Sequence, residues 1–308
     1  MRVVIVGPGA LGSFLAGFLS KNAQVILLDK DARRAERISK SGINCEGVSG
    51  KWSAKISATA HPSEIGSADL IIICTKAYDT KEAVLRAKPL VAKDTVILTL
   101  QNGLGNADII SEVLGGADIL AGVTHHGVTL LGEGSIVHAG SGETVIGSID
   151  GEIPVAVRQI REVFNKSNIE TRVSRDIKSI IWSKLVINTG INALGAITRL
   201  KNGELVELET TAEILRAAVT EAVRVAKKKR IKLIYDDPIA KVESVCEATA
   251  GNICSMLQDV TRKKKTEIDF INGVIVRQGR SAGIPTPINS LLVNLVKAIE
   301  SSYSKAVG

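Results

Sequence analysis

Three polar side chains recur at a fixed spacing in a largely apolar stretch of the chain. Lys184, Asn188 and Asn192 stand four residues apart, so in a helix they lie on one face. Asparagine is a poor helix former; solvent exposure would explain each residue singly, whereas a polar ligand bound along this face would explain them together. Reduction of a ketone leaves negative charge on the carbonyl oxygen, and a lysine can donate the proton and stabilise that charge. We interpret Lys184 as a candidate proton donor, and Asn188 and Asn192 as residues that orient a substrate.

Histidine is the usual alternative to lysine as a proton donor. His125 and His126 are adjacent, so on a strand they would point to opposite faces, and His61 and His138 show no partner pattern. The histidines therefore make a weaker case than Lys184.

A glycine-rich turn follows a short apolar strand expected at residues 2–6. It reads GPGALG over residues 7–12 and leads into an amphipathic helix. In this pattern the first glycine permits a tight turn, the second lets the backbone approach a pyrophosphate, and the third allows close packing of helix and strand. The helix N-terminus offers N–H groups to the phosphates. The turn predicts a dinucleotide site formed by Gly7, Gly9, Ala10, Leu11 and Gly12.

The residues after a second strand, expected at 24–28, bear on the choice of nicotinamide cofactor. Asp29 stands where an acid commonly binds the adenine ribose, and it would repel the 2′-phosphate of NADPH. Lys30 follows directly, and Arg33 and Arg34 lie just beyond, able to pair with such a phosphate. The acid favours NADH, and the basic residues keep NADPH open.

Two further polar residues follow strands of the same region. Lys76 comes directly after an apolar strand at 69–75, and Asn102 follows the next strand at 95–100. Ligands of α/β sheets bind at the carboxyl ends of strands, so Lys76 can neutralise cofactor charge and Asn102 can hydrogen-bond nicotinamide or substrate. A solvated lysine and a simple Asn-Gly turn remain the alternatives.

Strands and helices alternate through the first half of the chain, which predicts an α/β domain with a parallel, doubly wound sheet. The Gly-rich stretch 125–149 predicts additional strands at one edge of that sheet. From residue 176 onward the pattern is helical, so we expect a Rossmann domain over 1–175 and an all-helical domain, for substrate binding and dimerisation, over 176–308. The helices expected in the second domain cover residues 177–194, 210–230, 238–256, 267–282 and 287–302.

Composition narrows the range of partners. The formal net charge is +7, but the basic runs 227–230 and 262–265 fall in expected helices with few aromatic residues to stack bases, which favours solvated helix faces over nucleic-acid binding. Four cysteines without a CxxC pair predict reduced thiols and no metal site. We find neither a leader pattern nor an apolar run of about 18 residues. We therefore expect a cytoplasmic protein without membrane or nucleic-acid partners.

Taken together, these motifs resemble the ketopantoate reductase (2-dehydropantoate 2-reductase) family over essentially the whole chain. The set is far more specific than the glycine turn alone. The agreement is strongest in four segments: Trp182 to Thr198, Asn202-Gly203-Glu204-Leu205, Cys254 to Asp259, and Thr266 to Gly273.

The resemblance implies reduction of ketopantoate to pantoate, on the route to pantothenate and coenzyme A. We expect the enzyme to be a homodimer or a larger assembly. The resemblance implies a catalytic role for Lys184 with Glu267 as its partner carboxylate near the cofactor. Lys76 and Asn102 match positions near the cofactor and the reacting centre, and Asn102 also contacts substrate. Many members carry an arginine after the second strand, where this chain has Asp29-Lys30. The substrate-contacting positions are matched by Asn188, Asn192, Asn202 and Ser255.

Two other functions stay open on sequence grounds. One is reduction of another branched 2-keto acid, because the motifs define the chemistry better than the substrate side chain. The other is a dinucleotide-binding regulator without catalysis, which would touch nucleic acid through the lysine runs. The aligned Lys184, Asn188 and Asn192 argue against a regulator, because a sensor needs no proton donor.

Overall fold

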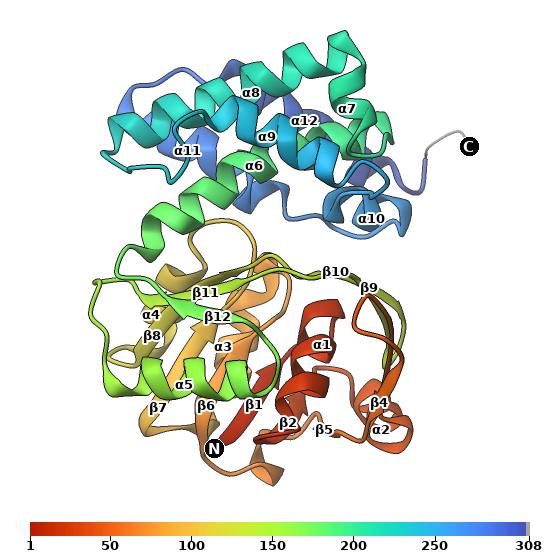
Figure 1. Ribbon diagram of the computed structural model, residues 1–308, viewed down its shortest axis with the longest axis vertical. Helices are drawn as coiled ribbons and strands as arrows, with labels where there is room; N and C mark the ends of the chain where they lie inside the picture. Colours follow the sequence, from red (N-terminus) through yellow and green to blue (C-terminus); the bar gives the residue numbers. More distant parts are fainter. Residues whose placement is uncertain (306–308) are drawn as a thin grey trace. The chain divides into compact units, whose positions relative to one another are not determined.

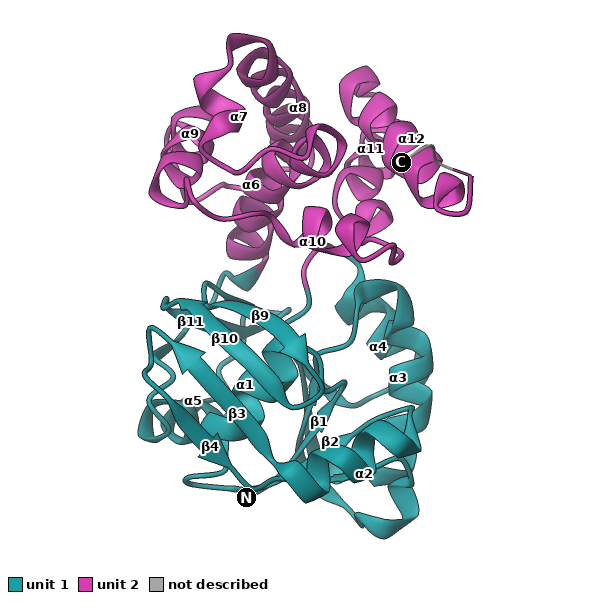
Figure 2. Ribbon diagram, turned by 90° about the vertical axis from the view of Figure 1, so that its right-hand side faces the viewer, with its two compact units in different colours: residues 1–101, 105–177 teal, residues 102–104, 178–308 magenta. Residues whose placement is uncertain are grey.

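Residues 1–305 are described by a computed structural model, which separates into two compact units (Figure 2). The first unit holds Met1–Gln101 and Gly105–Ile177, and the second holds Asn102–Leu104 and the chain from Lys178 onward. The short segment Asn102–Leu104 belongs to the second unit, although the predicted boundary near 175 would place it in the first. The reason is local pairing, because the Leu104 N–H donates a 3.1 Å hydrogen bond to the Phe270 carbonyl.

The first unit is built around an eight-stranded sheet (Figure 1). Across the sheet its strands are β12 (Thr171–Val173), β11 (Thr144–Ser148), β8 (Asp118–Thr124), β7 (Val91–Thr99), β6 (Ala68–Ile73), β1 (Arg2–Val6), β2 (Gln24–Leu28) and β5 (Ser57–Thr59). Neighbours pair in parallel except β8 and β11, which are antiparallel. The winding direction reverses between β1 and β6, which confirms the predicted doubly wound sheet.

Helices cover both faces of this sheet, because successive residues of a strand point to opposite sides. On β1, Val3 and Ile5 belong to the core of one face, and Val4 and Val6 belong to the core of the other. The first core includes side chains from α1 (Ala10–Leu19), α2 (Ala32–Ser41) and α5 (Val155–Lys166), and the second includes side chains from α3 (Thr80–Ala87) and α4 (Asn106–Leu114). Short 3-10 helices are η1 (Pro62–Glu64), η2 (Ala77–Asp79) and η3 (Lys88–Leu90).

A second sheet of four strands packs against α1. Its strands, in order, are β4 (Trp52–Ala54), β3 (Ile43–Gly47), β10 (Ser135–Gly140) and β9 (Gly127–Gly132). The prediction that 125–149 only adds strands to the edge of the main sheet is therefore wrong in part: β11 joins that sheet, whereas β9 and β10 do not. The cause is the parallel pairing of β10 with β3, a partner about ninety residues away that local sequence pattern does not reveal.

An aromatic cluster lies under this second sheet. Phe14 of α1 stacks on His126 and His138, with ring centroids 4.8 and 4.6 Å away, and Trp52 meets Phe18 edge to face. The two histidines, which lack a partner pattern in sequence, face each other with His126 Nδ1 and His138 Nε2 at 3.1 Å. Burial and the neighbouring imidazole lower the pKa of His126 to about 4, and burial also lowers the pKa of His138.

This histidine pair predicts a loss of stability in acid. The folded state holds His126 neutral. The contribution of this residue to the free energy of unfolding is therefore complete above pH 6.5 and is lost as the pH falls from 6.5 toward 4. We expect the free energy of unfolding to fall by about 1–3 kcal/mol across that interval from this residue. Denaturant titrations at pH 7 and pH 5 should show a smaller difference in His126→Gln than in the parent. His61→Gln, at an exposed histidine, is the control and should match the parent; equal pH dependence in all three would contradict the assignment.

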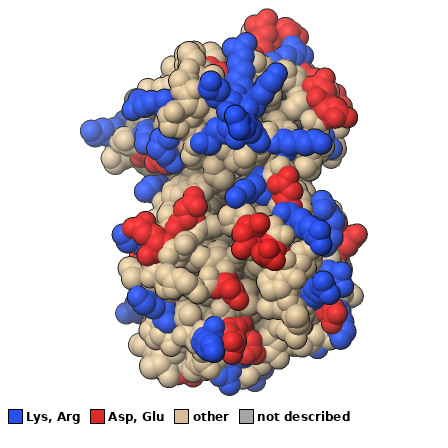
Figure 3. Space-filling model, turned by 90° about the vertical axis from the view of Figure 1, so that its left-hand side faces the viewer, with Lys and Arg blue, Asp and Glu red and all other residues tan. Residues whose placement is uncertain are grey.

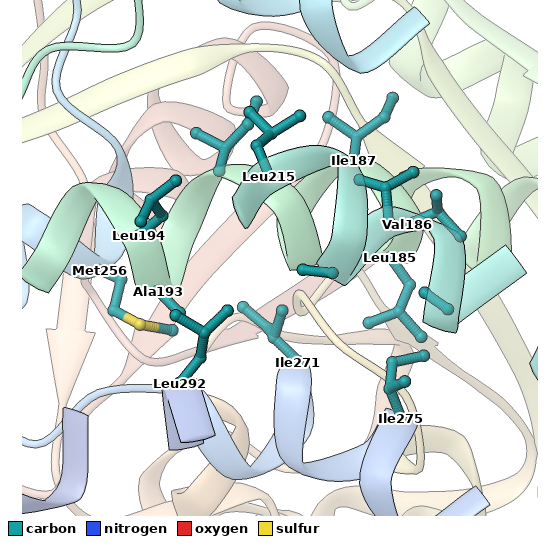
Figure 4. Close-up of a cluster of buried hydrophobic side chains, with 14 of the residues drawn as sticks. Leu185, Val186, Ile187, Ala193, Leu194, Leu215, Met256, Ile271, Ile275 and Leu292 are labelled. Atoms are coloured by element: carbon teal, nitrogen blue, oxygen red, sulfur yellow. The ribbon is translucent and has the colours of Figure 1, made fainter. Parts of the chain in front are cut away.

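The second unit is helical, and its core surrounds α6 (Ile177–Thr198). Figure 4 shows Leu185, Val186, Ala193 and Leu194 of this helix among apolar side chains of neighbouring helices. Of the residues that the structure describes, only α6 is long and apolar enough to cross a membrane by composition, yet 78% of its apolar window is buried inside the protein. The other helices are α7 (Glu204–Glu207), α8 (Glu209–Lys228), α9 (Pro238–Ala248), α10 (Ser255–Thr261), η4 (Ile268–Phe270), α11 (Asn272–Ala282) and α12 (Pro287–Ser302).

Three predicted helices of this unit differ in their bounds, and the first, expected over 177–194, continues to Thr198. The helix expected over 238–256 ends at Ala248, and a separate helix, α10, begins at Ser255 with the Cys254 side chain accepting a hydrogen bond from the Leu257 N–H. The helix expected from 267 begins at Asn272, after the turn η4. In both places a break in the helix sets a predicted site residue, Ser255 or Glu267, at the edge of a turn.

Candidate functional site

The glycine turn lies where the winding of the main sheet reverses. Gly7 has a φ of 98°, a left-handed conformation that favours glycine, and its N–H donates to the Leu28 carbonyl at the end of β2. A Cβ at Gly7 would stand 2.9 Å from the backbone nitrogen of Thr75, which follows β6. The turn and the segment after β6 therefore meet at the reversal point, where α/β sheets commonly hold their ligands.

The other two glycines of the turn differ in their surroundings. A Cβ on Gly12 would come within 2.1 Å of the Gly7 carbonyl oxygen. Only glycine at position 12 therefore lets the N-terminal part of α1 pack against the backbone of Gly7. A Cβ on Gly9 would meet nothing within 4 Å, so the space in front of Gly9 is open. Ala10 and Leu11 begin α1 and are partly buried. This geometry suits a backbone that receives a pyrophosphate at a helix N-terminus.

Lys76 and Gln101 occupy the ends of neighbouring strands in the first unit. Lys76 is partly buried and immediately precedes η2. Gln101 joins the ends of β6 and β7, since its Nε2 donates to the Thr75 carbonyl and to the Thr80 hydroxyl, both at 2.9 Å. Sequence reasoning missed this role of Gln101, because a bridge between two loops depends on the register of the strands before them. Asn102, by contrast, belongs to the second unit.

Asp29 is buried at the end of β2 and is fully engaged by neighbouring donors. Its Oδ1 accepts from the backbone N–H groups of Lys30 and Asp31 at 2.6 and 3.2 Å. The Arg34 guanidinium spans the carboxylate, with Nε on Oδ2 and Nη2 on Oδ1, each at 2.5 Å. Lys30 is exposed and pairs with Asp79 at 3.3 Å. Asp29, the residue expected to bind the ribose, therefore makes a bidentate ion pair with Arg34 of α2.

In the second unit α6 carries the three polar residues that the sequence placed on one face. Lys184 and Asn188 are partly buried and Asn192 is buried. Burial lowers the pKa of Lys184 to about 8, an effect partly offset by the negative charge of Glu267. A lysine with such a pKa gives up a proton readily near neutral pH, as a general acid must.

Glu267 lies in a tight turn before α11. Its side chain is only 5% exposed, and its carbonyl oxygen accepts from the N–H groups of Phe270 and Ile271. The Phe270 carbonyl in turn binds the Leu104 N–H at 3.1 Å. The segment that carries Asn102 is thus attached to the same turn that carries Glu267. The structure brings Lys184, Glu267 and Asn102 into one unit.

Asn202 has one unused polar atom. It is buried, and its Nδ2 donates to the Thr249 hydroxyl at 2.8 Å, while its Oδ1 has no hydrogen-bond partner among residues 1–305. A buried acceptor without a partner is costly, so a ligand hydroxyl or amine is the natural complement. Ser255 begins α10, whose capping residue Cys254 donates from Sγ to the Asn192 carbonyl at 3.5 Å. These contacts attach the loop before Ser255 to α6.

A buried polar network, which the sequence did not reveal, holds α6 to its neighbours. Asn272 of α11 donates from Nδ2 to the Thr189 carbonyl and to Asn289 Oδ1, both at 3.0 Å. Asn289 of α12 donates to Glu221 Oε2 of α8 at 2.7 Å. These four residues are almost fully buried, so their bonds set how α8, α11 and α12 pack on the helix that carries Lys184.

Charged side chains are distributed differently over the two units. On the face shown in Figure 3, Lys and Arg side chains gather over the helical unit, while both signs are interspersed over the sheet unit. The basic runs 227–230 and 262–265 are exposed. In the part of the chain that the structure describes, no group of three or more His, Cys, Asp or Glu residues is placed to hold a metal ion. All four cysteines are free thiols.

A Rossmann-type unit with a glycine turn at its reversal point, joined to a helical unit with a lysine of lowered pKa, defines a nicotinamide-dependent oxidoreductase. The models of the ketopantoate reductase family, PanE/ApbA, match residues 3–151, and those of its C-terminal part match 176–300. This chain belongs to the ketopantoate reductase family.

Curated relatives and solved structures agree with this placement. The 2-dehydropantoate 2-reductase of Pyrococcus horikoshii is 38% identical, over 98% of each chain, and that of Halobacterium salinarum is 34% identical, over 96% of this chain and 98% of its own length. The crystal structure of a family member from Ralstonia eutropha has a TM-score of 0.91 at 34% identity, covering 98% of this chain and 99% of its own. D-mandelate dehydrogenase in complex with NADH and anilino(oxo)acetate has a TM-score of 0.92 at 30% identity, with the same coverage.

Proposed function

We propose that this chain reduces 2-dehydropantoate to pantoate with NADPH or NADH, a step on the route to pantothenate and coenzyme A. The proposal depends mainly on one observation: Lys184, whose pKa is lowered, lies on the same face of α6 as Asn188 and Asn192. Family membership and the names of the curated relatives supply the substrate. We further propose that the enzyme works as a homodimer in the cytoplasm.

The cofactor would be held at the glycine turn of the first unit. Gly7, Gly9 and Gly12 shape the turn, and Ala10 and Leu11 present the N-terminus of α1 to the pyrophosphate. Lys76, at the end of β6, would neutralise phosphate or ribose-side charge. When bound, the reduced nicotinamide supplies a hydride to the keto carbon of the substrate.

Lys184 would complete the reduction by protonating the carbonyl oxygen. Its ammonium stabilises the negative charge that grows on this oxygen, and then transfers a proton to it. Burial makes the proton easier to release, while the carboxylate of Glu267 keeps the ammonium form populated in the resting enzyme. Glu267 therefore offsets part of the decrease that burial causes in the pKa of Lys184.

The asparagines and Ser255 would orient the substrate. Ketopantoate carries a carboxylate and a hydroxyl beside its keto group. The unpartnered Oδ1 of Asn202 can accept from the hydroxyl, because a buried acceptor gains most from a new donor. Asn188, Asn192, Asn102 and Ser255 can donate to the carboxylate and the keto oxygen. Holding both ends of the substrate aligns the keto carbon for hydride transfer.

Steady-state kinetics on a panel of 2-keto acids test this proposal. We expect kcat/KM for ketopantoate to exceed that for 3,3-dimethyl-2-oxobutanoate, which has a hydrogen in place of the hydroxyl, by roughly tenfold or more, because Asn202 would be left without its donor. Benzoylformate, the keto acid related to mandelate, belongs in the panel because the D-mandelate dehydrogenase structure shares this fold. A higher kcat/KM for benzoylformate would assign the chain to another 2-keto acid, and cofactor binding without turnover of any acid would indicate a regulator.

A further inference from the structure

We infer that Asn272 and Glu300 are positioning residues, which attach the turn that carries Glu267 to α6 and α12 and so keep its carboxylate beside Lys184. The inference deepens the proposed function and rests on it for the catalytic role of Lys184. Glu267 lies in the irregular segment between α10 and α11. Such a segment has few backbone bonds of its own, so contacts with its neighbours must hold it in place.

Asn272 attaches the C-terminal end of this turn to α6. Its side chain is fully buried, and its Nδ2 donates to the Thr189 carbonyl and to Asn289 Oδ1, both at 3.0 Å. Thr189 lies five residues after Lys184 on the same helix. The Asn272 Oδ1 has no hydrogen-bond partner among residues 1–305, which is costly for a buried acceptor. An apolar side chain of similar size would avoid that cost, so the two bonds that the amide donates are its main use.

Asn289 of α12 is itself fixed in one orientation. Its Nδ2 donates to Glu221 Oε2 at 2.7 Å and to the Ala218 carbonyl at 3.0 Å. The Glu221 carboxylate also accepts from the backbone N–H groups of Ile288 and Asn289, at 2.8 and 2.9 Å. Both N–H groups of the Asn289 amide are therefore engaged, and its oxygen is left to accept from Asn272. A buried network that is satisfied in this way is rigid.

Glu300 of α12 attaches the N-terminal end of the turn. Its Oε1 accepts from the Thr266 backbone N–H at 2.6 Å, a charge-assisted bond of the stronger kind. Lys297 of the same helix also pairs with Asp269, but these side chains are 47% and 39% exposed, and such a pair contributes little. The turn is thus attached one residue before Glu267 and five residues after it.

The position of Glu267 matters because two opposing effects determine how readily Lys184 gives up its proton. Burial lowers the pKa of Lys184 to about 8, and the negative charge of Glu267 raises it. The attraction between the two charges weakens with their separation, so a displaced turn would lower the pKa of Lys184 further. Asn272 and Glu300 therefore act on the proton donor through Glu267.

Titration of Lys184 by NMR tests the inference without catalysis. The full-length protein would carry lysine labelled with carbon-13 at Cε, and the Lys184 signal is the one that Lys184→Ala lacks. In the parent this signal should titrate near pH 8. In Asn272→Ala and in Glu300→Ala the pKa of Lys184 should fall by roughly one pH unit, because an opposite charge that moves away favours the ammonium less. The decrease in kcat at high pH should move by the same amount.

Two further variants separate position from charge and from stability. Glu300→Gln keeps an oxygen that can accept from the Thr266 N–H but loses the charge, so Lys184 should titrate in it as in the parent. Ser183→Ala is the matched control on α6, because its buried hydroxyl accepts from the Ile234 N–H at 2.9 Å and attaches the helix to a different segment. This variant should melt at a lower temperature and leave the pKa of Lys184 unchanged. Thermal melting checks that every variant is folded.

A double-mutant cycle with Glu267→Gln shows whether the effect passes through this carboxylate. In that background Asn272→Ala should no longer lower the pKa of Lys184, because the charge that Asn272 positions is gone. A decrease as large as in the parent background would overturn the inference. An unchanged or raised pKa in Asn272→Ala would also overturn it, since the contact would then only stabilise the fold or exclude water.

The remaining outcomes are equally decisive. A decrease in Ser183→Ala as large as in Asn272→Ala would overturn the inference, because any loosening of α6 would then suffice. Should Asn272→Ala fail to fold, the Glu300 variants decide: a decrease in Glu300→Ala that Glu300→Gln restores supports the inference, and its absence overturns it. If Lys184 titrates as expected but ketopantoate is not reduced, the proposed function fails while the positioning of Glu267 stands.

Discussion

Replacement of Lys184 by alanine is expected to lower kcat for ketopantoate by roughly 10²–10⁴-fold, the range that a positioned acid contributes. The affinity for the cofactor should stay nearly unchanged, because the glycine turn lies in the other unit. Lys184→Arg should be almost as slow, since a guanidinium keeps the positive charge but does not release its proton. Stopped-flow or steady-state rates with calorimetry of cofactor binding would separate the two effects.

The pH profile adds a readout that a purely structural role would not give. A general acid must carry its proton, so kcat should fall as the pH rises through about 8, the pKa of Lys184. This decrease in kcat at high pH should be absent in Lys184→Ala. The matched control is Lys178→Ala, at an exposed lysine on the same helix, which should keep both the rate and its decrease at high pH. A kcat that survives in Lys184→Ala would show that another group donates the proton.

Alanine at two glycines of the turn should separate folding from cofactor binding. At Gly12 the new Cβ would lie 2.1 Å from the Gly7 carbonyl oxygen and 3.3 Å from the Cys74 Cβ, and the backbone of Gly7 has little room to yield. We expect Gly12→Ala to lose stability by roughly 1–3 kcal/mol or more, as overpacking does, and to lose cofactor binding with it. Thermal melting and NADPH titration would measure the two losses.

Gly9→Ala should behave differently, because the added Cβ meets nothing in the protein. Its melting temperature should match that of the parent, while the methyl group stands where the pyrophosphate would approach and weakens cofactor binding by roughly tenfold or more. Tight cofactor binding in Gly9→Ala would show that the dinucleotide does not pass over this turn.

The parts of the fold that depend on local pattern could be predicted from sequence. The strands 2–6 and 24–28 and the helix 287–302 lie as predicted, because apolar periodicity and turn residues define them locally. The second sheet could not be placed, since β10 pairs with β3 across most of the first unit. The break between α9 and α10 was also missed, because Cys254 is an unusual capping residue.

Some residues of the candidate site could likewise be predicted from sequence, and others could not. The spacing of Lys184, Asn188 and Asn192 along one helix could be read directly. The link of Lys184 to Glu267 required the family resemblance, because the two residues are more than eighty positions apart. The state of Asp29 required the structure, since no spacing rule tells whether an acid after a strand is open or already bound to an arginine five residues later.

The assignment of Asn102–Leu104 to the helical unit has a consequence for the modularity of the enzyme. The polypeptide crosses from one unit to the other at three junctions, after residues 101, 104 and 177. A single splice near 177 would therefore not exchange one complete module for another, because residues 102–104 would be separated from the Phe270 carbonyl that binds Leu104. Chimaeras that graft a new helical unit onto this nucleotide-binding unit would also need to replace residues 102–104 with the matching segment of the donor protein.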